Sequence, residues 1–104
     1  MSDYKYIAKV SEFDEGEQLR SFVVDNIVVA VCKVDNEFYA FIDECSHQTL
    51  PLSDGFLTDK VVTCPFHGAE FDIKTGEALC LPAVEPIETF EVKVENDEIF
   101  VKLD

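Results

Sequence analysis

Both histidines of this chain follow a cysteine at close range. Cys45-Ser46-His47 and Cys64-Pro65-Phe66-His67 are separated by sixteen residues in a sequence of 104. Cysteine and histidine are the side chains that bind zinc and iron–sulfur centres. A site that uses all four requires the two segments to lie side by side. The fold must therefore bring two loops together around a metal.

Two metal chemistries fit these four side chains. Two Cys and two His form an ordinary tetrahedral zinc site, and CPFHG resembles a zinc knuckle. Only one residue separates Cys45 from His47, whereas zinc pairs usually keep two to four residues between ligands. A Rieske 2Fe–2S centre instead has two Cys at one iron and two His at the other. Neutral imidazoles make such a cluster less negative, which raises its potential above that of plant-type ferredoxins.

The residues around both pairs resemble those of Rieske ferredoxins. The first pair is followed by LSDG, and the second lies in CPFHG and is followed by FDIKTGE. The strand entering the first loop and the closing hairpin of that family are similar to FYAFIDECSH and FEVKVENDEIFVKL. The resemblance covers essentially the whole chain. It is strongest to the small ferredoxins of bacterial aromatic-ring-hydroxylating dioxygenase systems.

The resemblance implies a fold and a role for each ligand. The fold is all-β, with an antiparallel β-sandwich base formed by residues 1–42 and 84–104. A loop-rich cluster-binding subdomain, residues 43–83, is inserted into that base. The ligands of one [2Fe–2S] cluster would be Cys45 and Cys64 at the inner iron and His47 and His67 at the outer iron.

Rieske proteins of respiratory complexes differ from this chain at the matching positions. That subgroup has a disulfide between the two loops, where this sequence has Leu50 and Phe66. It also has a Ser and a Tyr that donate to the cluster, where this sequence has Ala69 and Phe71. Losing two donors destabilises the reduced cluster. We therefore expect a potential at the low end of the Rieske range, on the order of −150 mV.

The length of the chain limits the number of domains, and its terminal sequence and cysteine content indicate the cellular compartment. A chain of 104 residues predicts a single domain, residues 1–104. No run of eighteen apolar residues is present, and the start MSDYKYIAKV does not resemble a secretion signal. We expect a cytoplasmic protein with no membrane span. Four cysteines then indicate metal ligands and core thiols more than disulfides.

The net charge of −14 restricts the partners. Nucleic-acid phosphates would be repelled, so no nucleic-acid binding is expected. The acidity suits a monomer that docks transiently on partners with basic patches, and electrostatic steering would speed those encounters. It is equally consistent with a role in solubility alone.

Short Val-, Ile-, Phe- and Tyr-rich segments separated by Asp, Asn and Gly predict strands and tight turns. Three hairpins are expected, turning at Asp25-Asn26, near Asp35-Asn36 and near Asn96-Asp97. The segment SEFDEGEQL predicts a short helical turn or a loop.

The chain is not expected to be an enzyme. Large Rieske oxygenases have a second iron held by two His and a carboxylate, and here both His are expected to bind the cluster. No Gly-rich dinucleotide fingerprint is present. The resemblance implies a one-electron carrier that docks on a flavin-containing ferredoxin reductase and on the terminal oxygenase of an aromatic-ring dioxygenase. The alternatives are a small Rieske subunit of another oxidoreductase, such as a nitrite reductase, and a structural zinc module.

The other two cysteines are expected to have structural roles. Cys32 lies in VVAVCKV and predicts a core thiol, and Cys80 predicts a free thiol packed beside the site.

Several further side chains have two interpretations. Phe56, Phe66 and Phe71 are expected in the core, with a docking surface as the alternative. Asp43 and Glu44 could contact a basic partner or form a solvated loop edge. Gly68 either packs closely against the site or adopts a conformation that other residues resist.

Overall fold

The computed structural model describes residues 4–13, 18–35, 37–44, 51–65, 68–80 and 85–103, which form two antiparallel sheets. The larger sheet contains β1 (Tyr4–Lys9), β2 (Gln18–Val24), β3 (Ile27–Val34), β4 (Glu37–Ile42), β9 (Thr89–Glu95) and β10 (Glu98–Lys102). The smaller sheet contains β5 (Phe56–Thr58), β6 (Val61–Thr63), β7 (Glu70–Asp72) and β8 (Ala78–Cys80). Two 3-10 helices, η1 (Val10–Glu12) and η2 (Leu52–Asp54), complete the described elements. The predicted all-β antiparallel fold is confirmed.

Asn and Asp residues form the tight turns of the larger sheet. Asp25 and Asn26 have φ values of 50° and 67°, and Asn96 and Asp97 have values of 53° and 65°. Two consecutive positive φ values match the right-handed twist of the strands in a hairpin, and Asn and Asp tolerate them. Both predicted turns are confirmed. In the third hairpin Asp35 has a φ of 52°, while Asn36 lies outside the described residues.

The larger sheet folds over on itself to form a sandwich. Its strand order is β1-β10-β9-β4-β3-β2, and β4 and β9 share only two residue pairs, Ala40↔Phe90 and Phe41↔Thr89. This short junction lets the two halves of the sheet face each other. The core between them contains side chains from both halves: Ala8, Phe13, Val29, Val31, Ala40, Phe90, Ile99 and Val101.

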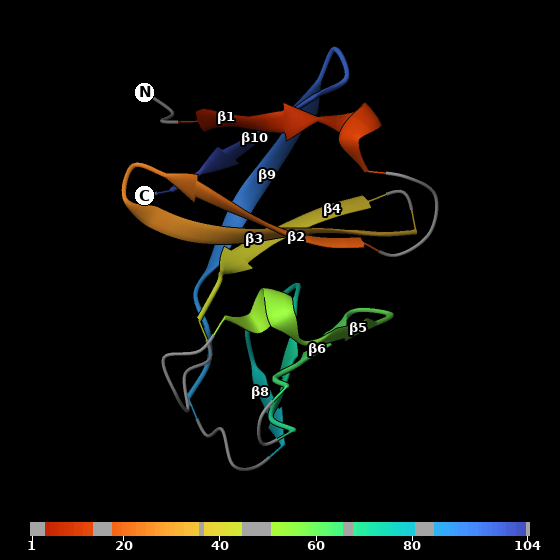
Figure 1. Ribbon diagram of the computed structural model, residues 1–104, viewed down its shortest axis with the longest axis vertical. Coiled ribbons are helices and arrows are strands. Elements are labelled where there is room, and N and C mark those ends of the chain that lie inside the picture. Colours follow the sequence, from red (N-terminus) through yellow and green to blue (C-terminus); the bar gives the residue numbers. More distant parts are fainter. Residues whose placement is uncertain are drawn as a thin grey trace.

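The smaller sheet packs on the opposite face of β3 and β4. Its strand order is β5-β6-β7-β8, and it lies below the sandwich in Figure 1. Alternate residues of a strand point to opposite faces, so β3 supplies Val29 and Val31 to the sandwich and Ala30 and Cys32 to the smaller sheet. The core on this second face, here called the lower core, contains Ala30, Cys32, Val34, Phe41, Leu52, Val62, Cys64, Ala69, Phe71, Ile73 and Ile87.

The strands are distributed in two blocks along the chain. All four strands of the smaller sheet lie within residues 43–83, and the strands of the larger sheet lie before and after them. This distribution supports our proposal of a single domain with a cluster-binding subdomain inserted into a β base. No helix among the described residues is long and apolar enough to cross a bilayer.

Candidate metal centre

Cys64 is the one predicted ligand whose surroundings the structure describes. It follows β6 directly, is 3% exposed and belongs to the lower core. The other three predicted ligands, Cys45, His47 and His67, lie outside the described residues. Their role as ligands therefore stays a prediction.

Hydrogen bonds within the segment 64–69 hold the backbone on both sides of His67. The Cys64 N–H donates to the Ala69 carbonyl at 2.7 Å, and the Gly68 N–H donates to the Cys64 carbonyl at 3.3 Å. These bonds hold the backbone of Cys64 next to that of Gly68 and Ala69. The position of Cys64 relative to the residues after His67 is therefore set by backbone geometry.

Gly68 is required in this segment for its backbone conformation. Its φ is +72°, a value that side-chain-bearing residues rarely adopt. Apart from its chain neighbours, no heavy atom of the described residues lies within 4 Å of the place where a Cβ would be added, so the described part of the chain leaves space there. Of the two interpretations of Gly68, the structure supports the conformational one.

Cys80 lies beside the same segment, as predicted. It is exposed at the end of β8, forms no disulfide, and its Sγ donates to the Gly68 carbonyl at 3.3 Å. Thiols are weak donors, so this contact adds a light restraint to the backbone that follows His67. Cys32, by contrast, is completely buried in the lower core, which confirms its predicted place in the core.

A buried carboxylate joins the two ends of the segment 43–53, which contains Cys45 and His47. Asp43 is 7% exposed, and its Oδ1 accepts the Ser53 backbone N–H at 2.7 Å. The Ser53 hydroxyl donates to Oδ2, also at 2.7 Å. The Asp43 N–H donates to the Val28 carbonyl of the base at 2.9 Å. The interpretation of Asp43 as a solvated loop edge was wrong, because its carboxylate is buried and links the two ends of this segment.

We expect Asp43→Ala to lower the free energy of unfolding by about 1–3 kcal/mol, since it leaves two partly buried donors of Ser53 without their acceptor. Denaturant unfolding of the holoprotein measures this loss. Glu44→Ala is the control, because Glu44 is exposed and its truncation should change stability by less than about 0.5 kcal/mol. Equal stability losses in the two variants would contradict this role of Asp43.

Gly55 follows the segment 43–53 and lies against β6, the strand that leads to Cys64. A Cβ added at Gly55 would lie 1.9 Å from the carbonyl oxygen of Thr63. The neighbouring Leu52 is fully buried in the lower core. The LSDG sequence thus lies against Thr63, the residue directly before Cys64. The sequence provided only a family resemblance for LSDG and did not predict the close approach of Gly55 to Thr63. A glycine directly before a strand was the feature that could have predicted it.

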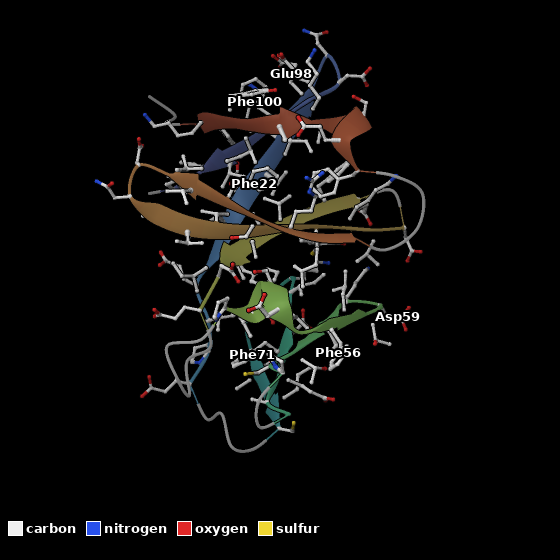
Figure 2. The ribbon with its side chains drawn as sticks, in the orientation of Figure 1. Phe22, Phe56, Asp59, Phe71, Glu98 and Phe100 are labelled. Atoms are coloured by element: carbon white, nitrogen blue, oxygen red, sulfur yellow. The ribbon has the colours of Figure 1, made fainter. Side chains whose placement is uncertain are left out.

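Two phenylalanines of the smaller sheet have opposite environments. Phe71 is fully buried, as predicted, whereas Phe56 is 65% exposed. Figure 2 labels both rings. The expectation of a core position for Phe56 was wrong, because Phe56 and Phe71 fall in adjacent cross-strand rows of the sheet, and adjacent rows point to opposite faces. Phe66 lies outside the described residues.

The described chemistry fits an iron–sulfur cluster. Cys64 is buried and forms no disulfide, and backbone hydrogen bonds join it to Gly68 and Ala69. Its side chain can therefore supply the thiolate that such clusters need as a ligand. Within the ranges that the structure describes, no group of three His, Cys, Asp or Glu side chains forms another candidate metal site.

The fold and the site define an iron–sulfur domain of the Rieske type. The family model described as "Rieske [2Fe-2S] domain" matches residues 3–91, and the chain belongs to this family. Among curated relatives, the 3-phenylpropionate/cinnamic acid dioxygenase ferredoxin subunit of Escherichia coli (strain K12) is 46% identical over 99 residues. That match covers 94% of this chain and 92% of the relative.

Solved structures agree with this assignment. The ferredoxin of carbazole 1,9a-dioxygenase from Nocardioides aromaticivorans IC177 has a TM-score of 0.92 and 30% identity, covering 99% of this chain and 100% of that one. A chain from the complex of reduced oxygenase and oxidized ferredoxin in carbazole 1,9a-dioxygenase has a TM-score of 0.86 and 34% identity, covering 93% and 99%. The predictions of a Rieske ferredoxin, of a Rieske-type [2Fe–2S] cluster and of an electron-transfer component rather than an oxygenase are confirmed. The zinc alternative is set aside.

Proposed function

We propose that this chain carries single electrons from a flavin-containing reductase to the terminal oxygenase of a multicomponent aromatic-ring dioxygenase. The Rieske match over residues 3–91 carries this proposal, together with relatives that are ferredoxin subunits of dioxygenases. A structural neighbour from a complex of oxygenase and ferredoxin supports the oxygenase as a partner.

Each predicted ligand has a role in this proposal. Cys45 and Cys64 would hold one iron as thiolates, and His47 and His67 would hold the other through one ring nitrogen each. The bound cluster would supply reversible one-electron reduction. The described residues would support it in two ways: the backbone hydrogen bonds of Gly68 and Ala69 hold the chain beside His67, and the lower core keeps water away from Cys64.

Reconstitution with purified components tests the function. The ferredoxin, a reductase of the same system and the terminal oxygenase should together convert an aromatic substrate, and omitting the ferredoxin should abolish product formation. The relatives' names make 3-phenylpropionate and cinnamic acid the first substrates to try. If oxygenase turnover is the same with and without the ferredoxin, the proposal is wrong.

Transient docking is the second part of the proposal. We infer a cytoplasmic monomer whose charge of −14 speeds its encounters with basic surfaces. Raising ionic strength from about 0.01 to 0.15 M shortens the Debye length from about 30 to 8 Å and should slow reduction by the reductase. Stopped-flow measurement of the second-order rate tests this. A rate that does not change with salt would leave the acidity as a solubility feature.

A further inference from the structure

We propose that a groove beside the first ligand segment binds a basic side chain of the terminal oxygenase. This proposal rests on the proposed function and names one contact of the docking surface. The groove consists of two adjoining cavities of about 260 and 280 Å³, which share Val28, Asp43 and Glu44. We call it the hairpin groove, because one side is the tip of the β2–β3 hairpin. Its remaining lining residues are Ser21, Asn26, Ile27, Ile42, Pro51, Ser53 and Asp54.

The hairpin side of the groove includes Val28, which belongs to an exposed apolar patch. Val28 is 41% exposed, and Val23, its direct cross-strand partner, is 73% exposed. Directly paired residues of antiparallel strands point to the same face, so the two valines form one patch. Further along the same face of β3, Ala30 and Cys32 are buried under the smaller sheet. The patch is therefore the uncovered end of a surface that is otherwise packed.

The opposite side of the groove is acidic. Glu44 and Asp54 are exposed, whereas the Asp43 carboxylate is already bonded to Ser53. Lys, Arg and His do not occur among the lining residues, all of which belong to the described part of the chain. Two carboxylates next to an apolar patch, without a cation between them, attract a positive group.

The groove is lined by residues on both sides of the first Cys–His pair in the sequence. Glu44 directly precedes Cys45, and Pro51 and Asp54 follow the same segment. A partner group seated there would be placed at the base of the segment that contains Cys45 and His47. Contact at this position suits a partner that must come close to the cluster.

An Arg or Lys side chain on the oxygenase fits both sides of the groove. Its methylene stem would cover Val28, at the edge of the valine patch, while its charged end would face Glu44 and Asp54. Arginine fits best, because its planar guanidinium binds carboxylates through two hydrogen bonds and sheds its weak hydration easily. The oxygenase is the partner because a structural neighbour of this chain comes from a complex of oxygenase and ferredoxin.

A charge-neutralising double variant tests the groove. We expect Glu44→Gln with Asp54→Asn to raise the ferredoxin KM of the oxygenase about tenfold, which corresponds to about 1.4 kcal/mol, with kcat unchanged. The matched control is Glu37→Gln with Glu95→Gln. It removes the same charge from exposed positions, and Glu37 lies at the end of β4 away from the groove. This control should raise KM less than twofold.

Two valine variants test the apolar side in the same assay. Val28→Ser should raise the ferredoxin KM severalfold. Val94→Ser, on the β9 side of the base, should leave KM unchanged, although Val94 is 49% exposed. The reduction potential and the electron paramagnetic resonance signal of each variant should match those of the wild type, which separates docking from damage to the cluster.

Other results would overturn the proposal. Equal KM increases in both charge pairs would show that only net charge matters. Slower reduction by the reductase, with an unchanged oxygenase KM, would assign the groove to the reductase instead. If the wild-type ferredoxin supports no oxygenase turnover, the proposed function itself is wrong. If the wild type is active and the groove variants have the same ferredoxin KM as the wild type, only the groove proposal is wrong.

Discussion

Cys64→Ser is expected to abolish cluster binding. Cys64 directly follows β6 and is 3% exposed, and its proposed role is that of a thiolate ligand of the inner iron. A serine hydroxyl is a much poorer ligand for iron in a cluster that is built on thiolates. Iron and acid-labile sulfide per chain, together with the visible absorption spectrum, measure the loss.

The remaining described cysteines serve as controls for this loss. Cys32→Ser and Cys80→Ser should keep a full complement of iron and sulfide, because neither residue is a proposed ligand. A loss of the cluster in Cys32→Ser would challenge the ligand assignment. Full cluster content in Cys64→Ser would refute it.

Phe71→Ala is expected to destabilise the protein by about 3–5 kcal/mol. The ring is fully buried in the lower core, which also contains Cys64, and its truncation would leave a cavity between the smaller sheet and the base. This loss is a large fraction of the stability of a small domain. Denaturant unfolding, followed by far-ultraviolet circular dichroism and by cluster absorbance, measures it.

Phe56→Ala is the matched control. The same atoms are removed from the same sheet, but Phe56 is 65% exposed, so the expected change is within about 0.5 kcal/mol. Similar losses in the two variants would show that the lower core does not depend on Phe71 as described.

Much of the local structure could be predicted from the sequence. Asn and Asp in pairs between apolar runs specify tight turns, and the positive φ values at Asp25-Asn26 and Asn96-Asp97 follow from that chemistry. The strand positions follow from β-branched and aromatic residues between those turns. These features depend on neighbours in the chain, so a local pattern is sufficient to identify them.

The environment of single side chains could not be predicted in the same way. Asp43 and Glu44 are adjacent acidic residues, yet one is buried and accepts two hydrogen bonds from Ser53, while the other is exposed. The partner of Asp43 is ten residues away, beyond the segment that contains Cys45 and His47. Which of two neighbouring carboxylates receives such a partner depends on the direction of each side chain at the end of β4.

The sequence by itself indicated the family and the cofactor, because two Cys–His pairs and the motifs that flank them resemble those of Rieske ferredoxins. Only the tertiary structure decided which side chains beside the proposed ligands are buried and which are exposed. Burial depends on what the remote chain places over each strand face: the smaller sheet covers Ala30 and Cys32 on β3 and leaves Val28 open.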